Sequence, residues 1–210
     1  MQQLALDVCG ADRRVHPPEP IARAACVVGD YRYWLRRRWA HGPEVMWCML
    51  NPSTADASQD DPTLKRVMGF SYRWGFAGCV VVNLYPYRSP HPAALAAWRR
   101  AMIANVEQPD RSARWDAYCR NVKEVAGIVE SASMHIAAWG AFEPSPGDRH
   151  SVLSFIADEL SPIEIDWRCI GVTAGGFPKH PFARGLHRVP DSAEPVLYFP
   201  DEVQHAAAPD

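Results

Sequence analysis

Short apolar runs alternate along the chain with segments whose apolar residues recur at helical spacing. The apolar runs predict strands at residues 44–50, 78–84, 134–139 and within 163–172. The helical spacing predicts helices at residues 61–74, 93–104, 115–131 and 149–160. Strands that alternate with helices are typical of a three-layer α/β/α fold with a mostly parallel central sheet.

The two ends of the chain carry different patterns. Residues 26–29 and 31–36 predict a hairpin that turns at Gly29-Asp30, and residues 195–199 predict a final short strand. Residues 1–20 predict an irregular lead-in that ends in prolines, and residues 201–210 predict a frayed tail. Nothing divides the chain, so we expect one domain over residues 1–210.

Polar residues follow several of the predicted strands. Asn51 follows the strand at 44–50, Asn83 ends Val-Val-Val-Asn, Trp139-Gly140 ends the third strand, and His180 follows the fourth. Open α/β sheets bind ligands outside the carboxyl ends of their strands. We therefore expect Asn51, Asn83 and His180 to meet at one edge of the sheet.

Each of these residues has a structural and a functional interpretation. Asn51 is either a turn residue before Pro52 or an amide that positions a water or a substrate oxygen. Asn83 carries a donor and an acceptor, so it either reads the edge of a planar base or bonds the backbone. Asp60 and Asp61 are helix caps or orient Asn51, and capping is favoured. His180 follows Gly175-Gly176, and a neutral imidazole there can donate to a carbonyl that gains negative charge.

Composition narrows the range of functions. The formal charge is −2, which gives no global signal for nucleic acid, and the basic cluster Arg36-Arg37-Arg38 favours a solvated face. The six cysteines show no metal-ligand spacing, and Cys48, Cys79 and Cys169 lie in apolar runs, so we expect core thiols, no metal and no cofactor. No signal peptide or membrane-length apolar stretch is recognisable, which predicts a cytoplasmic protein.

Taken together, the segments resemble two known families. Leu-Asn-Pro-Ser-Thr-Ala, Asp-Pro-Thr, Asn-Leu-Tyr-Pro-Tyr-Arg and Pro-Lys-His-Pro are similar to the bacterial and phage family of domain of unknown function 1643. Over roughly residues 45–185, the order Asn-Pro, Val-Val-Val-Asn, Ala-Trp-Gly and His-Pro also resembles the uracil-DNA glycosylase superfamily. The second resemblance implies a glycosylase-like fold and a monofunctional DNA glycosylase that leaves an abasic site.

The glycosylase resemblance also implies roles for individual residues. Asn51 places the attacking water, Asn83 reads the base, and His180 stabilises the leaving base anion. Phe70 is a candidate stacking partner, and Ser53 stands where uracil-specific members carry a tyrosine, which leaves room beside carbon 5 of the ring. A 5-modified, phage-type cytosine or uracil is therefore a candidate substrate.

The loop after His180 departs from the superfamily, because Phe182-Ala183-Arg184 replaces its Ser-Pro-Leu. Arg184 is a candidate phosphate contact there, and Lys179 is a second candidate DNA contact. Lys179 also offers a minor alternative, a Schiff base that nicks the strand.

Three functions remain open at this level. The first is base excision from DNA by a monomer. The second is a hydrolase or transferase that acts on free nucleosides or nucleotides, which the weak net charge favours slightly. The third is a nucleic-acid binder without catalysis.

Overall fold

The computed structural model describes residues 16–53, 55–103, 109–141 and 165–198. The helix expected at 149–160, the frayed tail and most of the irregular lead-in lie outside these ranges. Residues 16–20 form no helix or strand, as expected for the end of the lead-in.

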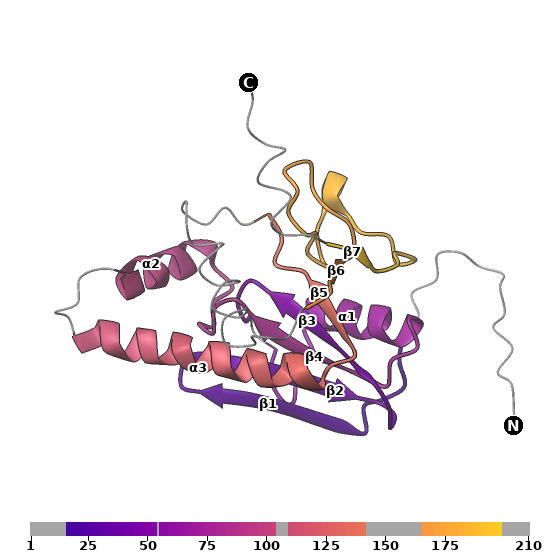
Figure 1. Ribbon diagram of the computed structural model, residues 1–210, viewed down its shortest axis with the longest axis horizontal. Coiled ribbons are helices and arrows are strands. Elements are labelled where there is room, and N and C mark those ends of the chain that lie inside the picture. Colours follow the sequence, from indigo (N-terminus) through magenta and orange to yellow (C-terminus); the bar gives the residue numbers. More distant parts are fainter. Residues whose placement is uncertain (1–15, 54, 104–108, 142–164, 199–210) are drawn as a thin grey trace, which may run out of the picture.

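The described strands form one sheet in the order β1-β2-β4-β3-β5-β6-β7 (Figure 1). Their bounds are β1 Ala22–Val28, β2 Tyr31–Arg38, β3 Glu44–Met49, β4 Gly78–Asn83, β5 Met134–Ala137, β6 Trp167–Cys169 and β7 Val196–Leu197. The predicted hairpin and the four predicted central strands are all present, with small shifts at their ends.

The sheet is parallel only in its centre, which corrects the expectation of a mostly parallel sheet. β4, β3, β5 and β6 pair in parallel, whereas β1 with β2, β2 with β4, and β6 with β7 pair antiparallel. The tight turn at Gly29, whose φ is +55°, forces β1 and β2 to run in opposite directions. The carboxyl ends of the four central strands nevertheless share one edge.

The described helices are α1 Pro62–Arg73, α2 Pro92–Ile103 and α3 Pro109–Ser131, with a short 3-10 helix, η1, at Gly185–His187. α1 begins where the sequence predicts, because Asp61 Oδ1 accepts a hydrogen bond from the amide of Leu64 at 2.8 Å and Pro62 opens the first turn. α3 begins six residues earlier than the predicted 115.

Two apolar clusters place the helices on opposite faces of the sheet. α1 packs through Leu64, Val67 and Phe70 on the face of β3 and β4 that carries Trp47 and Val81. α2 and α3 cover the other face, where their apolar residues pack against Met46, Cys48, Val80 and Val82 (Figure 1). The described residues therefore form the three layers that the sequence predicts.

The predicted core thiols are confirmed, since Cys48, Cys79 and Cys169 are fully buried. Burial raises the pKa of Cys79 to about 12, which keeps it a thiol at neutral pH. Within the described ranges, every helix is too short or too polar to cross a lipid bilayer.

Candidate functional site

A small cavity lies where the strand order reverses. β3 is followed by α1 and β4 on one side and has β5 on its other side, which makes its carboxyl end a topological switch point. The cavity has a volume of about 50 Å³. Residues from three strands, the β3–α1 loop, the start of α1 and the loop after β6 line it: Arg32, Leu35, Met49, Asn51, Ser53, Ala55, Asp61, Thr63, Leu64, Val81 and His180.

Asn51 forms hydrogen bonds that hold two loops together, and it also lines the cavity. Its Nδ2 donates to the carbonyl oxygens of Pro52, Tyr87 and Ser89 at 3.2, 3.3 and 2.8 Å. These bonds join the segment after β3 to the segment after β4. The donor end of the amide is thus committed to the protein, and the carbonyl end is the part that Asn51 can offer to a water or ligand.

His180 is held at the cavity by backbone pairing. Lys179 N donates to Gly171 O at 2.9 Å, and Gly140 N, just past β5, donates to Pro178 O at 3.0 Å. Gly140 has a φ of +81°, and a Cβ there would lie 3.5 Å from the Cβ of His180. The Trp139-Gly140 segment therefore anchors the histidine loop to the end of β5.

The hydrogen bonding of His180 determines its protonation. The amide of Phe182 donates to His180 Nδ1 at 3.1 Å. Nδ1 must therefore carry a lone pair, which leaves the hydrogen on Nε2 in the neutral ring. Burial lowers the pKa of the imidazole from 6.5, and the charge of Asp61 opposes that shift. His180 is thus a neutral ring whose Nε2–H is the donor it can offer to a ligand.

The two neighbouring aspartates, Asp60 and Asp61, have different partners in the structure. Asp60 accepts hydrogen bonds from Arg37 Nε at 2.8 Å and from Arg23 Nη1 at 3.0 Å, so its carboxylate is occupied by two guanidinium groups. Asp61 lines the cavity with His180 and uses Oδ1 to cap α1. Asp61 is therefore the carboxylate that can meet a water in the cavity.

Arg32 is a cavity residue that the sequence pattern did not reveal. The register of β1 against β2 passes from Cys26–Trp34 to Val27–Arg32, so Tyr33 is an extra residue in β2. Such a bulge turns the following side chains to the other face of a strand. Trp34 bonds Glu124 of α3, whereas Arg32 faces the cavity beside Leu35. Strict alternation would place Arg32 on the same face as Trp34, away from the cavity.

The side chain of Arg32 is only partly satisfied. Its Nη1 donates to Ala55 O at 2.7 Å, while its buried Nε has no hydrogen-bond partner among the described residues. Burial lowers the pKa of Arg32 to about 10, so the guanidinium remains charged at neutral pH. A buried cation with an unused donor is suited to an anionic or strongly polar ligand.

The arginine cluster at 36–38 is not the solvated face that the sequence suggested. Arg37 is fully buried and also donates from Nη2 to Asp56 O at 2.6 Å. Arg38 forms an ion pair with Glu44 at 2.9 Å. Arg37 anchors the segment before α1 to the sheet, whereas Arg36 and Arg38 are partly exposed and pair with Glu44 of β3.

Asn83 lies beside the cavity without lining it. It is fully buried, and its register partner is Met49, a lining residue. Alternation along β4 places it on the same face as Val81, another lining residue. Its Nδ2 and Oδ1 both lack a hydrogen-bond partner among the described residues. A buried unpaired amide costs roughly 1–3 kcal/mol, so the lack of partners for both atoms sets Asn83 apart from an ordinary core residue.

The other predicted site residues lie outside the cavity. Phe70 is buried in the core, where it stacks on Trp74 with ring centres 5.7 Å apart, and it does not line the cavity. Lys179 precedes His180 but is not among the lining residues. Arg184 is exposed, and its guanidinium carbon lies 5.5 Å from the ring centre of Phe182. The cavity therefore gathers Asn51, Ser53 and His180, and adds Arg32 and Asp61.

Comparisons with known proteins identify a family without an assigned reaction. Residues 32–182 match the family DUF1643, which is described as a protein of unknown function. No curated protein and no solved structure matches the chain significantly. The matched range contains every residue that lines the cavity.

Proposed function

The chain belongs to the DUF1643 family, and we propose that its cavity cleaves the N-glycosidic bond of a pyrimidine extruded from DNA, leaving an abasic site. The observation that carries this proposal is the hydrogen bond from Phe182 N to His180 Nδ1. It fixes a neutral histidine with its donor on Nε2, beyond the carboxyl ends of the parallel central strands. An extruded base is required because the glycosidic carbon is inaccessible inside a stacked duplex.

His180 supplies stabilisation of the leaving group. As the glycosidic bond breaks, the sugar gains positive charge and the base leaves as an anion. An Nε2–H donor aimed at a base carbonyl bonds more strongly as the negative charge grows, and such differential bonding lowers the barrier. The lowered pKa keeps the imidazole neutral, so His180 donates a hydrogen bond to the base without adding a positive charge to the site.

Asp61 and Asn51 supply the water. Asp61 uses Oδ1 for the helix cap, which leaves Oδ2 to accept a proton from a water in the cavity. The carbonyl end of Asn51 orients the same water, since its Nδ2 is already bonded to the backbone. Asp61 thereby accepts the proton of the water, which the amide of Asn51 is unable to do.

Base selection rests on Asn83 and Ser53. The unpaired donor and acceptor of Asn83 fit two adjacent atoms on a pyrimidine edge, and an amide meets either a uracil or a cytosine edge by rotation. Ser53 is a small side chain on the cavity wall, which favours a base with a substituent on carbon 5. A 5-modified cytosine or uracil is the substrate class that we infer.

The cavity is smaller than a bound base requires. Its volume of about 50 Å³ holds water rather than a pyrimidine, and ligand pockets commonly span roughly 300–1,000 Å³. The proposal therefore includes a widening of the cavity when the nucleotide enters. Recovery of the unmet hydrogen bonds of Asn83 and Arg32 offsets part of the cost of that widening.

A second candidate is the hydrolysis of free nucleosides or nucleotides. The net charge of −2 favours it, because DNA-binding proteins commonly carry a basic surface. Under this alternative the same cavity releases a base from a free nucleoside or nucleotide, and the protein neither binds DNA nor releases a base from it. A binder without catalysis predicts the reverse, DNA binding without base release.

The test compares base release from three DNAs, which carry normal bases, uracil, or a 5-modified cytosine. Free base and alkali-labile sites are measured for the wild type, His180→Ala and Asp61→Asn. The matched controls are His187→Ala and Asp30→Asn, which change exposed residues outside the cavity. We expect release from the 5-modified DNA by the wild type and both controls, and none by the two cavity variants.

Other outcomes would contradict the proposal in identifiable ways. Release from free nucleosides alone would support the second candidate. Full activity of His180→Ala and Asp61→Asn on every substrate would show that the reaction takes place elsewhere. DNA binding without any released base would favour the non-catalytic binder.

A further inference from the structure

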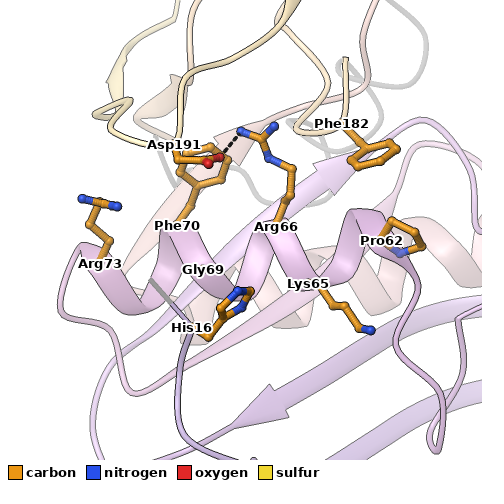
Figure 2. Close-up of a pocket in the computed structure, with 9 residues that line it drawn as sticks. All are labelled: His16, Pro62, Lys65, Arg66, Gly69, Phe70, Arg73, Phe182 and Asp191. Carbon is orange, nitrogen blue, oxygen red and sulfur yellow. Dashed lines mark ion pairs between the residues drawn. The ribbon is translucent and has the colours of Figure 1, made fainter. Parts of the chain in front are cut away.

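A second, larger pocket lies on the outer side of α1, next to the histidine loop. Its volume is about 270 Å³. Figure 2 shows it between α1, the segments that carry Phe182 and Asp191, and His16. We propose that this pocket binds a nucleotide unit, in addition to the one whose base enters the smaller cavity.

The walls of the pocket are fastened together. Arg66 Nη2 donates to Val189 O at 2.7 Å and forms an ion pair with Asp191 at 2.8 Å (Figure 2). Trp74 Nε1, at the end of α1, donates to Ala193 O at 3.1 Å. The helix and the segment at 189–193 therefore form a fixed groove, which reduces the ordering cost of binding a ligand.

The floor of the pocket is a glycine in the middle of a helix. Gly69 lies in the interior of α1, where glycine costs about 1 kcal/mol of helix stability relative to alanine. Figure 2 shows Gly69 between Lys65 and Arg73, with the ring of His16 beside it. The groove thus lies at the glycine in the interior of the helix.

The lining selects an anion that carries a flat ring. Three cations, Lys65, Arg66 and Arg73, and one carboxylate, Asp191, line the pocket, and Asp191 forms an ion pair with Arg66. Phe182 adds an aromatic ring on which a base can stack. Phosphate groups pair with lysine and arginine, so the combination fits a nucleobase joined to a phosphate.

The two pockets are linked through one residue. The ring of Phe182 lines the larger pocket, while its amide donates to His180 Nδ1 in the smaller one. Arg184 stacks on the same ring. An occupant that shifts Phe182 therefore acts on the bond that sets the protonation of His180.

The nucleotide has two possible sources with the same chemistry. It is either a free mononucleotide or the neighbour of the extruded nucleotide in a DNA strand, and only the second source rests on the proposed function. Titration calorimetry with deoxyadenosine monophosphate, deoxyadenosine, inorganic phosphate and a ten-residue oligothymidylate distinguishes them. A strand source predicts that the oligonucleotide binds more tightly than the mononucleotide, and a free source predicts the opposite.

Two independent changes test the site. Gly69→Leu fills the groove, and Gly69→Ala is its control, because alanine adds one methyl group and favours the helix. The double variant Lys65→Gln, Arg73→Gln removes two cations of the pocket. Its control, Arg100→Gln, Lys123→Gln, removes two exposed cations from α2 and α3.

We expect deoxyadenosine monophosphate to bind the wild type more tightly than deoxyadenosine or inorganic phosphate does. Gly69→Leu and the Lys65/Arg73 variant should each weaken that binding at least tenfold, while both controls bind as the wild type does. If Gly69→Leu fails to fold, the Lys65/Arg73 variant decides the question.

Wild-type affinity in both test variants, or no binding of any probe to the wild type, would overturn the inference. Its failure is separable from failure of the proposed function. Gly69-dependent nucleotide binding without base release from any DNA would keep the inference and reject the glycosylase. The opposite result is base release at the wild-type rate in Gly69→Leu and in the Lys65/Arg73 variant, with no nucleotide binding by the wild type. That result would keep the glycosylase and reject the inference.

Discussion

His180 shows how one backbone hydrogen bond assigns a chemical role to a side chain. The amide of Phe182 has one hydrogen to donate, and it donates to Nδ1. A protonated imidazole would place two hydrogens against each other, so the charged form is disfavoured by geometry as well as by burial. Both effects favour a neutral donor over a general acid.

A pH dependence follows from the lowered pKa of His180. The neutral ring is favoured in the folded state, so its contribution to stability is complete above pH 6.5, the ordinary pKa, and is lost as the pH falls through the lowered value. We expect the stability difference between the wild type and His180→Gln, measured by urea unfolding, to shrink between pH 7.5 and pH 5. A nuclear magnetic resonance titration that gave His180 a pKa above 6.5 would contradict the assignment.

Two variants of Asp61 distinguish its role as a helix cap from its proposed role in catalysis. Asparagine caps helices about as well as aspartate, whereas alanine loses roughly 0.5–2 kcal/mol of stability. We expect Asp61→Asn to melt like the wild type and Asp61→Ala to melt lower, while neither variant releases base. Base release by Asp61→Asn at the wild-type rate would show that the carboxylate acts as a cap alone.

The sequence predicts the cavity residues that follow strand ends and misses those that depend on a register shift. Asn51, Ser53 and His180 meet because the carboxyl ends of parallel strands share an edge. Arg32 was missed because one extra residue in β2, Tyr33, reverses the face on which it lies. No local signal in Tyr-Arg-Tyr-Trp-Leu-Arg marks where such a bulge occurs.

At the scale of elements, the bulge in β2 gives the cavity a buried cation at a cost to stability. Arg32 leaves its Nε without a partner. Replacement of a partly satisfied buried charge by an apolar residue of similar length is often neutral or stabilising. We expect Arg32→Met to keep or raise the urea midpoint and to lower base release. A large loss of stability in this variant would show that the bond to Ala55 O is the main role of Arg32.

The network around Asp60 connects β1, β2 and the segment before α1. Arg37 is fully buried, and Asp60 is the carboxylate that balances its charge. Removal of one partner of a buried ion pair commonly costs about 3–5 kcal/mol, because the other charge remains buried. We expect a loss of this size for Asp60→Ala in urea unfolding.

Glu19 provides the control for that prediction. It pairs with Arg23 at 2.7 Å, but 85% of its side chain is exposed. Solvent screens such a pair, so Glu19→Ala should leave the urea midpoint nearly unchanged. Equal losses in the two variants would show that burial does not set the strength of these pairs.

For the whole molecule, the layered core was predictable and the edges of the sheet were not. Apolar runs such as Val80–Val82 identify buried strands, and helical spacing around Leu64 and Val67 identifies the face of α1 that covers them. The antiparallel pairing of β2 with β4 depends on which strand the hairpin joins, and the hairpin sequence itself does not encode that choice. The sequence of a half-buried strand is compatible with pairing to several neighbouring strands, so its partner is known only once the whole fold is known.

The salt dependence of DNA binding reports how many phosphates the protein neutralises. Each phosphate that the protein neutralises changes the slope of log K against log salt by roughly −0.9 on duplex DNA. Arg184 is exposed beside the histidine loop, so Arg184→Gln should reduce the slope by about 1 without changing which base is released. A slope equal to that of the wild type, measured by gel shift across a salt series, would remove Arg184 from the DNA contacts.

The two pockets differ in how much of their lining lies within the region that matches the family. Every residue around the smaller cavity lies within positions 32–182, whereas His16 and Asp191, which help to close the larger pocket, lie outside. The smaller cavity is thus assembled wholly from the matched region, whereas the larger pocket also needs residues from before and after it.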